Sequence, residues 1–263
     1  MAIKYLKINN TRHCHLTVLV YAENMIEKIN YINSLTGLLS DQFIENSHSI
    51  GQLIYWHKCS GDHIQIRGHE QLRWLLINDT LQSVIDLNDP SLLLFPHLLC
   101  LGKQWQALSA PKKVLELGLG GGAIRNYLQH KYPKAHITSV EKNADIIDCY
   151  TQFFSSNKND QLLCADAQQV LKSAQNIDWI ILDLFSQIDA PRFLFEEAFY
   201  KKIYLALNNN GVLFINFLSQ HESQLKQLKQ LLLDVFGCTV SPQKITGYVN
   251  HIVVVTKKLK QIS

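Results

Sequence analysis

Long hydrophobic runs and clustered positive charge are both scarce in this sequence of 263 residues. No apolar stretch approaches the roughly 18 residues that a membrane-spanning helix needs. Lys and Arg number 25 against 22 Asp and Glu, which leaves a formal net charge of +3. The one basic run, KKLK at 257–260, is too short for a nucleic-acid-binding surface. These absences predict a protein with neither a membrane nor a nucleic-acid partner.

Paired cysteines are also absent. The six cysteines form no CxxC motif and stand at positions Cys14, Cys59, Cys100, Cys149, Cys164 and Cys238. Their spacing indicates neither a disulfide framework nor a zinc site, so we expect reduced thiols, a cytoplasmic location and no bound metal. His13 and His15 flank Cys14 in an expected strand, but no further ligand cluster accompanies them. The apolar stretch TVLVYA is too short for a signal peptide, and Glu23 follows it directly.

The apolar residues that are present make up 47% of the chain, enough for a buried core. Up to about residue 105, short segments rich in β-branched and aromatic residues alternate with turn signals such as SGD and GHE, which predicts a small antiparallel sheet. One helix-like stretch, MIEKINYINSLTGLL at 25–39, interrupts these segments. We therefore assign residues 1–105 to an N-terminal β-rich domain.

After Pro111 the pattern changes to strands that alternate with helices. We expect strands at KVLEL, HITSVE, QLLCA and DWIILD. Helices are expected between them, over 121–131, over 143–154 and after Asp166. This alternation predicts a parallel sheet covered by helices on both faces.

The end of the chain continues this pattern with a helix over 194–207, a turn at NNNG, a strand GVLFINFL and a helix over 223–236. The last strand, HIVVVTKK, is expected to pair near residues 238–240. A terminal strand directly after the last helix is the ending expected of the methyltransferase fold, whereas a dinucleotide-binding domain usually passes on into a substrate domain. Residues 106–263 are thus predicted to form a seven-stranded, Rossmann-like α/β domain.

A string of glycines follows the first strand of this domain, in VLELGLGGGA at 114–123. The backbone N–H groups around Gly118, Gly120 and Gly122 lie next to a helix N-terminus, where they suit a carboxylate or the polar edge of a nucleotide. The GxGxxA spacing fits a dinucleotide fingerprint as well as an adenosylmethionine loop. Glu116 inside the strand is typical of methyltransferase loops and argues against a dehydrogenase.

Acidic residues stand at the ends of the next three strands, where ligands bind in open parallel sheets. Glu141 is placed to accept the hydroxyl groups of a ribose. Asp166 opens a helix, so it is an N-cap, a contact to an adenine amino group, or both. Asp183 is placed to orient or deprotonate an incoming nucleophile, with a turn-forming role as the plain alternative.

Taken together, VLELGLGGGA, HITSVE, CADA, DWIILDLF and FLFEEAFYKKIYLALNNNGVLFINF resemble the spermidine synthase superfamily, and in particular its divergent bacterial members. The similarity covers residues 50–256, with Gln82 at the glutamine of the family's hairpin. The resemblance implies that Glu141 binds ribose, that Asp166 binds adenine and that Asp183 is the catalytic aspartate. The cofactor-binding set expected from these arguments is Glu116, Gly118, Gly120, Gly122, Glu141, Asp166 and Gln82.

The sequence departs from the family where carboxylates bind the amino groups of the substrates. Gly121 stands at the position of the aspartate in the glycine loop, Ser186 stands at the position of a second aspartate, and LFPHLL replaces the Tyr-His-Glu segment. A diamine without paired carboxylates is costly to desolvate. Backbone N–H groups instead suit a ligand that bears its own carboxylate, which favours intact S-adenosylmethionine over its decarboxylated form.

We therefore expect a transferase that moves a group from an adenosylmethionine-type sulfonium to a small nucleophilic acceptor, with no metal. Two alternatives stay open. One is a true spermidine synthase, which transfers an aminopropyl group from decarboxylated S-adenosylmethionine to putrescine. The other is a non-catalytic relative that binds the nucleotide. A homodimer is one candidate assembly, and the sequence does not determine the oligomeric state.

Overall fold

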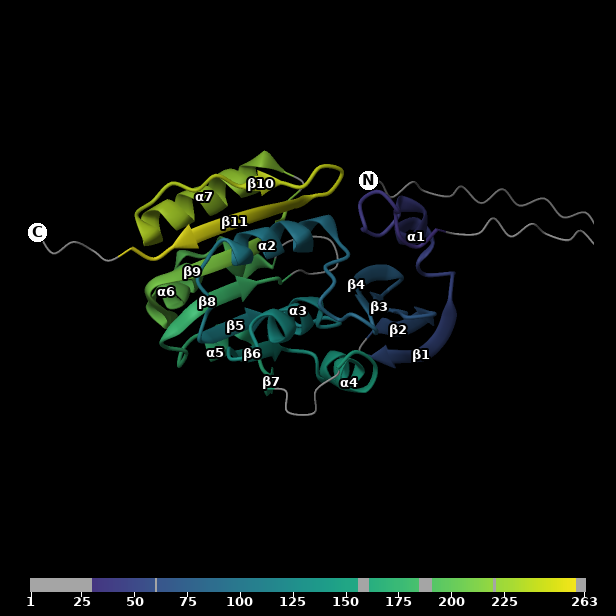
Figure 1. Ribbon diagram of the computed structural model, residues 1–263. Helices are drawn as coiled ribbons and strands as arrows, with labels where there is room; N and C mark the ends of the chain where they lie inside the picture. The colour runs from purple at the N-terminus through teal and green to yellow at the C-terminus, as the bar shows by residue number, and fades with distance from the viewer. Residues whose placement is uncertain (1–29, 60, 156–160, 185–190, 220, 259–263) are drawn as a thin grey trace, which may run out of the picture.

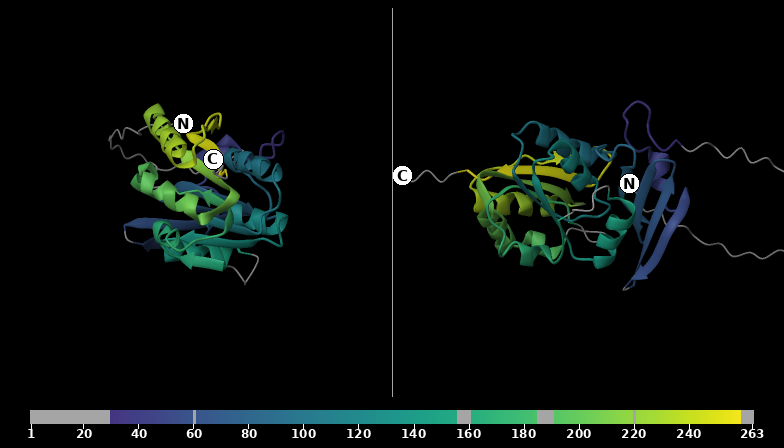
Figure 2. Two further views of the ribbon diagram at one scale, coloured as in Figure 1. Left: turned by 90° about the vertical axis from the view of Figure 1, so that its left-hand side faces the viewer. Right: turned by 60° about the horizontal axis from the view of Figure 1, so that its bottom comes forward.

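The computed structural model describes residues 30–59, 61–155, 161–184, 191–219 and 221–258 (Figure 1). The expected strand around Cys14 and the first part of the helix expected over 25–39 lie outside these residues. Within them, no helix is long and apolar enough to cross a membrane. The chain folds into a small antiparallel sheet and a larger mixed sheet with helices on both faces, as predicted (Figures 1 and 2).

The small sheet has four strands, each paired with its neighbour in the chain. They are β1 (Gln52–Cys59), β2 (Asp62–His69), β3 (Leu72–Ile77) and β4 (Thr80–Asp86). Asn78 and Asp79 form the turn between β3 and β4, with φ of 48° and 62°. Two such left-handed residues match the twist of the strands on either side of a hairpin turn.

The part of the expected helix 25–39 that is described is a turn. Ile32 and Leu39 form an isolated bridge, and the Asn33 side chain accepts the N–H of Leu35 at 2.9 Å. This local side-chain bond competes with helical hydrogen bonding. A helix, α1 (Asp41–Asn46), starts later, after the side chain of Ser40 caps its first turn.

The large sheet has seven strands, of which only the last strand in the chain runs antiparallel to the others. Their order is β10 (Gln243–Lys244), β11 (Asn250–Thr256), β9 (Leu207–Leu218), β8 (Ile177–Leu182), β5 (Lys113–Leu117), β6 (His136–Glu141) and β7 (Gln161–Cys164). The chain order of the strands reverses between β5 and β8. The carboxyl ends of these two strands therefore mark the place where a ligand cleft is expected in such a sheet.

Two layers of helices enclose this sheet. One layer comprises α2 (Pro96–Gln106), α3 (Ala123–Lys131) and α4 (Ala144–Phe153). The other comprises α5 (Ala167–Val170), α6 (Glu197–Ala206), α7 (Glu222–Phe236) and the 3₁₀ turn η1 (Arg192–Phe195). Successive side chains along a strand point to opposite faces of the sheet. Val114 of β5 therefore packs in the first core, whereas Leu115 and Leu117 pack in the second.

Two details of the C-terminal half differ from the sequence-based predictions. The NNNG segment belongs to β9, where it bulges out: Leu207 is opposite Ile177, yet Val212 is already opposite Trp179. The outer partner of β11 is β10 rather than residues 238–240. Gly237 ends α7 by adopting a left-handed conformation. The residues that follow it therefore form the connection from α7 back to the sheet.

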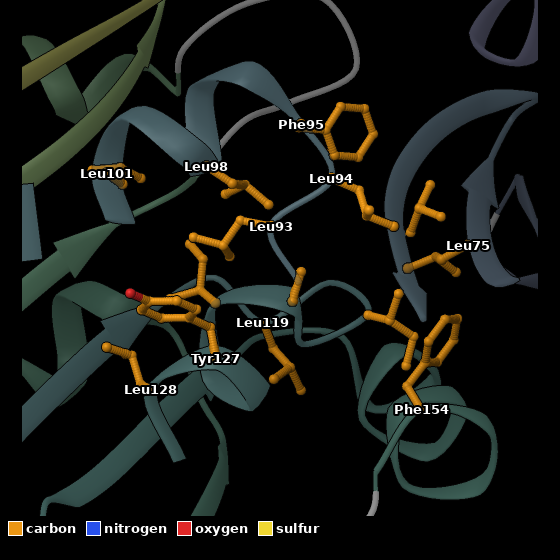
Figure 3. Packing of buried hydrophobic residues seen from close by; sticks show 14 of the residues in the cluster. Leu75, Leu93, Leu94, Phe95, Leu98, Leu101, Leu119, Tyr127, Leu128 and Phe154 are labelled. Carbon is orange, nitrogen blue, oxygen red and sulfur yellow. The ribbon is translucent and has the colours of Figure 1, made fainter. Parts of the chain in front are cut away.

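Helix α2 lies within the region assigned by sequence to the N-terminal domain, but it packs on the large sheet. The side chain of Trp105 is fully buried, with its ring 5.5 Å from that of Tyr127 on α3 and 6.2 Å from that of Phe214 on β9. The linker before α2 carries Leu93 and Leu94 into the same core, which continues to Leu75 of β3 (Figure 3). One continuous apolar core thus joins the two sheets.

Candidate active site at the ends of the parallel strands

The glycine loop, residues 118–122, joins β5 to α3 and packs closely on its neighbours at Gly118, Gly121 and Gly122, whereas Gly120 faces open space. Gly118, Gly120 and Gly122 have φ of 100°, 51° and 74°, a region that disfavours other residues. A Cβ at Gly118 would overlap the carbonyl group of Asp183, and one at Gly122 would overlap the ring of Tyr150. The glycines therefore permit both the turn and the close packing of the loop against its neighbours.

Glu116 lies beneath this loop and is inaccessible from the cleft, which corrects its expected role as a direct ligand contact. Its side chain is fully buried and accepts a hydrogen bond from the Ser139 hydroxyl. Arg125 of α3, also buried, donates to the same hydroxyl at 2.7 Å. Burial raises the pKa of Glu116 to about 8, against smaller lowering effects of Ser139 and Arg125. Glu116 thus links β5, β6 and α3 below the loop.

Glu141, at the carboxyl end of β6, lies against the loop. One carboxylate oxygen accepts the backbone N–H of Leu119 at 3.5 Å, and the other accepts that of Asn143 at 3.0 Å. The long contact to Leu119 leaves that oxygen with bonding capacity for another donor. The side chain is half-buried, so it is both oriented and accessible.

Asp166 is at the neighbouring strand end, after β7, and its side chain is exposed. It caps α5 by accepting the N–H of Gln168 at 2.8 Å. The backbone N–H of Ala165 donates to the Glu141 carbonyl at 3.0 Å, which ties the two strand ends together. The structure therefore shows the N-cap role and leaves the second carboxylate oxygen of Asp166 toward solvent-accessible space.

Asp183 follows β8, directly across from the glycine loop. Its backbone N–H donates to the carbonyl of Leu117 at 2.9 Å. Its Oδ1 accepts a hydrogen bond of 2.7 Å from the amide of Asn216, whose own oxygen accepts one of 2.8 Å from the amide of Asn250. Burial raises the pKa of Asp183 to about 6, and the Asn216 bond lowers it by less.

The small sheet reaches the glycine loop through β4. A Cβ at Gly121 would lie 2.8 Å from the Cβ of Ser83 and 3.3 Å from the Phe154 ring, so Ser83 fills the space that a side chain at Gly121 would need. Gln82, next to Ser83, is half-buried, and its amide donates to the Thr80 carbonyl at 3.1 Å. Gln82 therefore lies near the loop but is bonded to its own strand.

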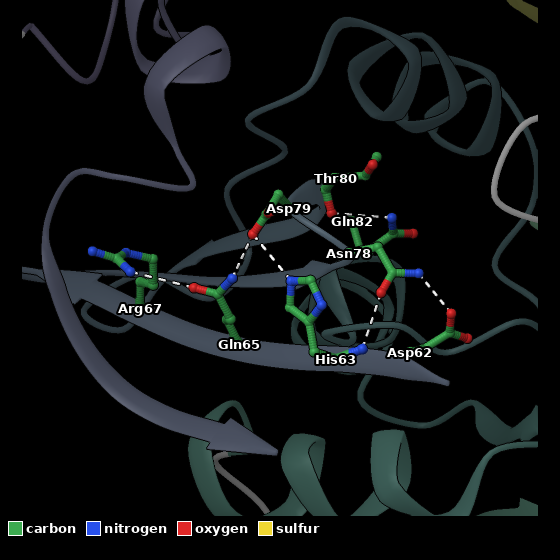
Figure 4. Close-up of polar contacts among 8 residues, drawn as sticks. All are labelled: Asp62, His63, Gln65, Arg67, Asn78, Asp79, Thr80 and Gln82. Atoms are coloured by element: carbon green, nitrogen blue, oxygen red, sulfur yellow. Dashed lines mark hydrogen bonds and ion pairs between the residues drawn. The ribbon is translucent and has the colours of Figure 1, made fainter. Parts of the chain in front are cut away.

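Two carboxylates of the small sheet that are close in sequence to Gln82 are held by local partners. Asp79 accepts hydrogen bonds from Gln65 at 2.6 Å and from His63 at 3.1 Å (Figure 4). Asp86 accepts the backbone N–H groups that follow it in the next turn. In both residues the hydrogen bonds are made to Oδ1, so each carboxylate is oriented by its own hairpin or turn.

His97 and the two asparagines behind Asp183 were missed by the sequence analysis. His97 starts α2 within the FPH segment, with its ring 5.2 Å from that of Phe95. Its Nδ1 is buried and has no hydrogen-bond partner among the described residues, and burial lowers its pKa to about 4. The imidazole of His97 is therefore uncharged at neutral pH. Asn216 was detectable as the one polar residue in the apolar strand VLFINFL.

Comparison with known proteins identifies the family. Residues 101–261 match the spermine/spermidine synthase domain. A polyamine aminopropyltransferase of Vibrio vulnificus (strain CMCP6) is 31% identical over 125 residues, which cover 43% of this chain and 42% of that protein. The chain thus spans less than half the length of this curated relative. It belongs to the spermine/spermidine synthase family, as the resemblance implied.

Solved structures support the same fold. A probable spermidine synthase from Corynebacterium glutamicum ATCC 13032 aligns with a TM-score of 0.67 at 21% identity, over 79% of this chain and 80% of that one. Human methyltransferase-like protein 13, solved in complex with SAH, aligns with a TM-score of 0.51 at 24% identity, over 58% of this chain and 73% of that one. The predicted methyltransferase-like fold is confirmed.

The contact between Ser83 and Gly121 yields a prediction. Gly121→Asp, which restores the family's loop carboxylate, is expected to lower the free energy of unfolding by about 1–3 kcal/mol, because the new Cβ overpacks Ser83. Thermal or urea unfolding of Gly121→Asp, Ser83→Gly and the double variant measures this. The double variant should recover part of the loss, through a coupling of about 0.5–3 kcal/mol. Strictly additive effects would contradict the contact.

Proposed function

We propose that this chain is a transferase that uses an adenosylmethionine-type sulfonium as donor and a small nucleophile as acceptor. The observation that carries the proposal is the position of the glycine loop. It contacts the Glu141 carboxylate through the Leu119 N–H and the backbone of Asp183 through Gly118. A nucleoside at Glu141 and a nucleophile at Asp183 would thus lie along one short loop, where positioning supplies most of the rate enhancement.

Glu141 would accept the ribose hydroxyl groups. Its two oxygens are already oriented by backbone N–H groups, so binding would not require the side chain to reorganise. Asp166 would accept a hydrogen bond from the adenine amino group through the oxygen that does not cap α5. Both proposed contacts are to the nucleoside, which the intact and the decarboxylated donor share.

The choice between these two donors rests on Gly121 and Ser83. A loop aspartate would pair with the ammonium group of decarboxylated S-adenosylmethionine, but Ser83 takes the space for it. Loop N–H groups near the N-terminus of α3 suit a carboxylate instead. We infer that the intact donor, S-adenosylmethionine, is the better ligand, which favours methyl transfer.

Asp183 would act as the general base. With its pKa near 6, it is mostly ionised at neutral pH yet basic enough to accept a proton. The nucleophile's lone pair forms the bond to carbon, the carbon–sulfur bond breaks, sulfur keeps that electron pair as a neutral thioether, and the nucleophile's proton passes to Asp183. A neutral or weakly charged acceptor fits, because the buried His97 is uncharged and Gly121 stands in place of the family's loop carboxylate.

Aminopropyl transfer to putrescine is the second candidate. The name of the Vibrio relative, a polyamine aminopropyltransferase, favours it. The carboxylates missing at Gly121 and Ser186 oppose it, because each lost contact to a charged amine costs roughly 1.5–3 kcal/mol. Ser186 lies outside the described residues. A nucleotide-binding relative without catalysis is the third reading, and the base position of Asp183 argues against it.

The two asparagines behind Asp183 would fix which oxygen acts as base. The Asn216 carbonyl oxygen accepts from Asn250, so its NH₂ group must face Asp183. Asn216 and Asn250 are only 3% and 7% exposed. Rotation of either amide group by 180° would leave a buried polar atom without a hydrogen bond, which is costly. Oδ1 of Asp183 is therefore occupied, and Oδ2 would receive the proton.

Removal of the Asn216 amide is expected to raise the pKa of Asp183, because the bond from Asn216 stabilises the ionised form. NMR titration of the labelled Asp183 carboxyl carbon in Asn216→Leu measures this without any substrate. In a transfer assay, the rate should rise with pH through about 6 in the unmodified protein. In the variant, that rise should move to higher pH.

Asn208→Leu is the matched control, because its amide donates to Asp178 at 2.7 Å at the opposite end of β8. It should leave the titration of Asp183 unchanged. Equal Asp183 titrations in Asn216→Leu and the unmodified protein would rule out the hydrogen-bond chain as the device that sets this pKa.

Nucleoside binding at Glu141 is tested by calorimetry with methylthioadenosine, which lacks the groups that differ between the two donors. Glu141→Ala should weaken binding by about 1–3 kcal/mol, through the loss of charge-assisted hydrogen bonds. Glu197→Ala is the control, since Glu197 pairs with Lys201 on the exposed side of α6. Unchanged affinity of a folded Glu141→Ala variant would remove the basis of the proposed function.

A further inference from the structure

A second cluster of chemically active side chains lies where the small sheet meets α4, apart from the strand ends. His57 and Cys59 come from β1, and Asp145 comes from the first turn of α4. The imidazole nitrogen, the thiol sulfur and the carboxylate oxygen that these residues offer as ligand atoms all lie within 4.8 Å of one another. His57 Nε2 and Asp145 Oδ1 are 3.9 Å apart. Among the described residues, no other group of three His, Cys, Asp or Glu side chains gathers in this way.

The alternation of β1 explains how the cluster forms. Tyr55, His57 and Cys59 point inward and are partly buried, whereas Trp56 and Lys58 between them are exposed. Tyr55 packs on Phe153 of α4, with ring centroids 5.4 Å apart. The same strand face therefore contacts α4 through rings at one end and through polar side chains at the other. Figure 1 shows α4 beside β1 of the small sheet.

An ion pair alone explains little of this arrangement. The His57 and Asp145 side chains are 45% and 33% exposed, and such surface pairs contribute about 0–1 kcal/mol. Imidazole, thiolate and carboxylate together are the donor types that bind zinc.

The spacing is close to that of a zinc site. With zinc–ligand bonds of about 2.0–2.3 Å, tetrahedral ligand atoms are roughly 3.3–3.8 Å apart. The His57–Asp145 distance of 3.9 Å is near that range. The widest separation allowed by the cluster, 4.8 Å, needs about 1 Å of closure. Rotation of these partly buried side chains would supply this adjustment.

We propose that His57, Cys59 and Asp145 bind a zinc ion, with water as the fourth ligand. The Cys59 thiol loses its proton to solvent when the zinc–sulfur bond forms, and no electron is transferred. The ion joins β1 of the small sheet to α4 of the large domain. The cluster is partly open to solvent, which gives the ion an entry path.

Zinc at this position also supports the loop that orients Glu141. Asn143 donates its backbone N–H to Glu141 at 3.0 Å, and its side chain accepts the N–H of Asp145 at 2.9 Å. Fixing Asp145 therefore restrains the Asn143 cap and, through it, the Glu141 carboxylate. This consequence rests on the proposed function, whereas zinc binding itself does not.

The test measures zinc binding by the full chain directly. Chelator-treated protein is titrated with zinc alone by calorimetry, and bound metal is counted by mass spectrometry after dialysis. Cobalt(II) serves as a second probe, because a cobalt–thiolate bond gives a charge-transfer absorption. One zinc per chain, a cobalt–thiolate band and a zinc-dependent rise in melting temperature are expected.

Cys59→Ser and Asp145→Asn should weaken zinc binding by about tenfold or more, and Cys59→Ser should also abolish the cobalt–thiolate band. Cys164→Ser is the matched control, since Cys164 is an exposed strand cysteine on β7. It should bind zinc as the unmodified protein does. Melting curves of the metal-free variants check that each is folded, and His57→Gln serves if Cys59→Ser is not.

Two results would overturn the proposal. The first is no stoichiometric zinc in the unmodified chain. The second is equal zinc affinity in the unmodified, Cys59→Ser and His57→Gln proteins, which would place the ion elsewhere. Neither result bears on methylthioadenosine binding, so failure of the zinc site and failure of the proposed function are distinguishable.

Discussion

The close approach of the glycine loop to the end of β8 is the constraint on which the site depends. Gly118 packs against the Asp183 carbonyl group with no room for a Cβ, and the Asp183 N–H returns a bond to Leu117. This backbone contact sets where the Asp183 side chain emerges. It also fixes the start of the glycine loop. The next backbone N–H in this loop, that of Leu119, donates a hydrogen bond to the Glu141 carboxylate. A side chain at position 118 would disturb all of these positions together.

The small sheet takes part in the site through shape rather than charge. Ser83 of β4 lies against Gly121, and the apolar core continues from β3 through the linker to α3 (Figure 3). In the family pattern, an aspartate in the loop faces the amino group of the donor. In this chain the same place is closed by a neighbouring strand. Position 121 therefore lacks both the carboxylate of the family pattern and the space for one.

The strand–helix alternation was enough to predict the large sheet, because buried parallel strands such as KVLEL and DWIILD are short, apolar and followed by turn residues. The rule that ligands bind at strand ends placed Glu141, Asp166 and Asp183 near one another without a structure. The GxGxxA motif located the loop. Local signals of this kind act over a few residues, so the sequence reveals them.

Features that depend on tertiary contacts could not be predicted from the sequence. Nothing in VLELG shows that Glu116 is enclosed by Ser139 and Arg125. The bonds from Asn250 to Asn216 to Asp183 join three strands that are distant in sequence. His57 and Cys59 are two residues apart on one strand, but Asp145, which lies beside them, is far along the chain. The NNNG bulge also follows from strand register, which the turn composition alone does not specify.

The central claim is that the glycine loop binds a donor that keeps its carboxylate. Calorimetry of the unmodified protein with S-adenosylmethionine and with decarboxylated S-adenosylmethionine, under identical conditions, tests it most directly. The account predicts tighter binding of the intact donor, because loop N–H groups bind its carboxylate and no aspartate is present for the ammonium group of the other. Tighter binding of the decarboxylated donor would contradict the account and favour aminopropyl transfer.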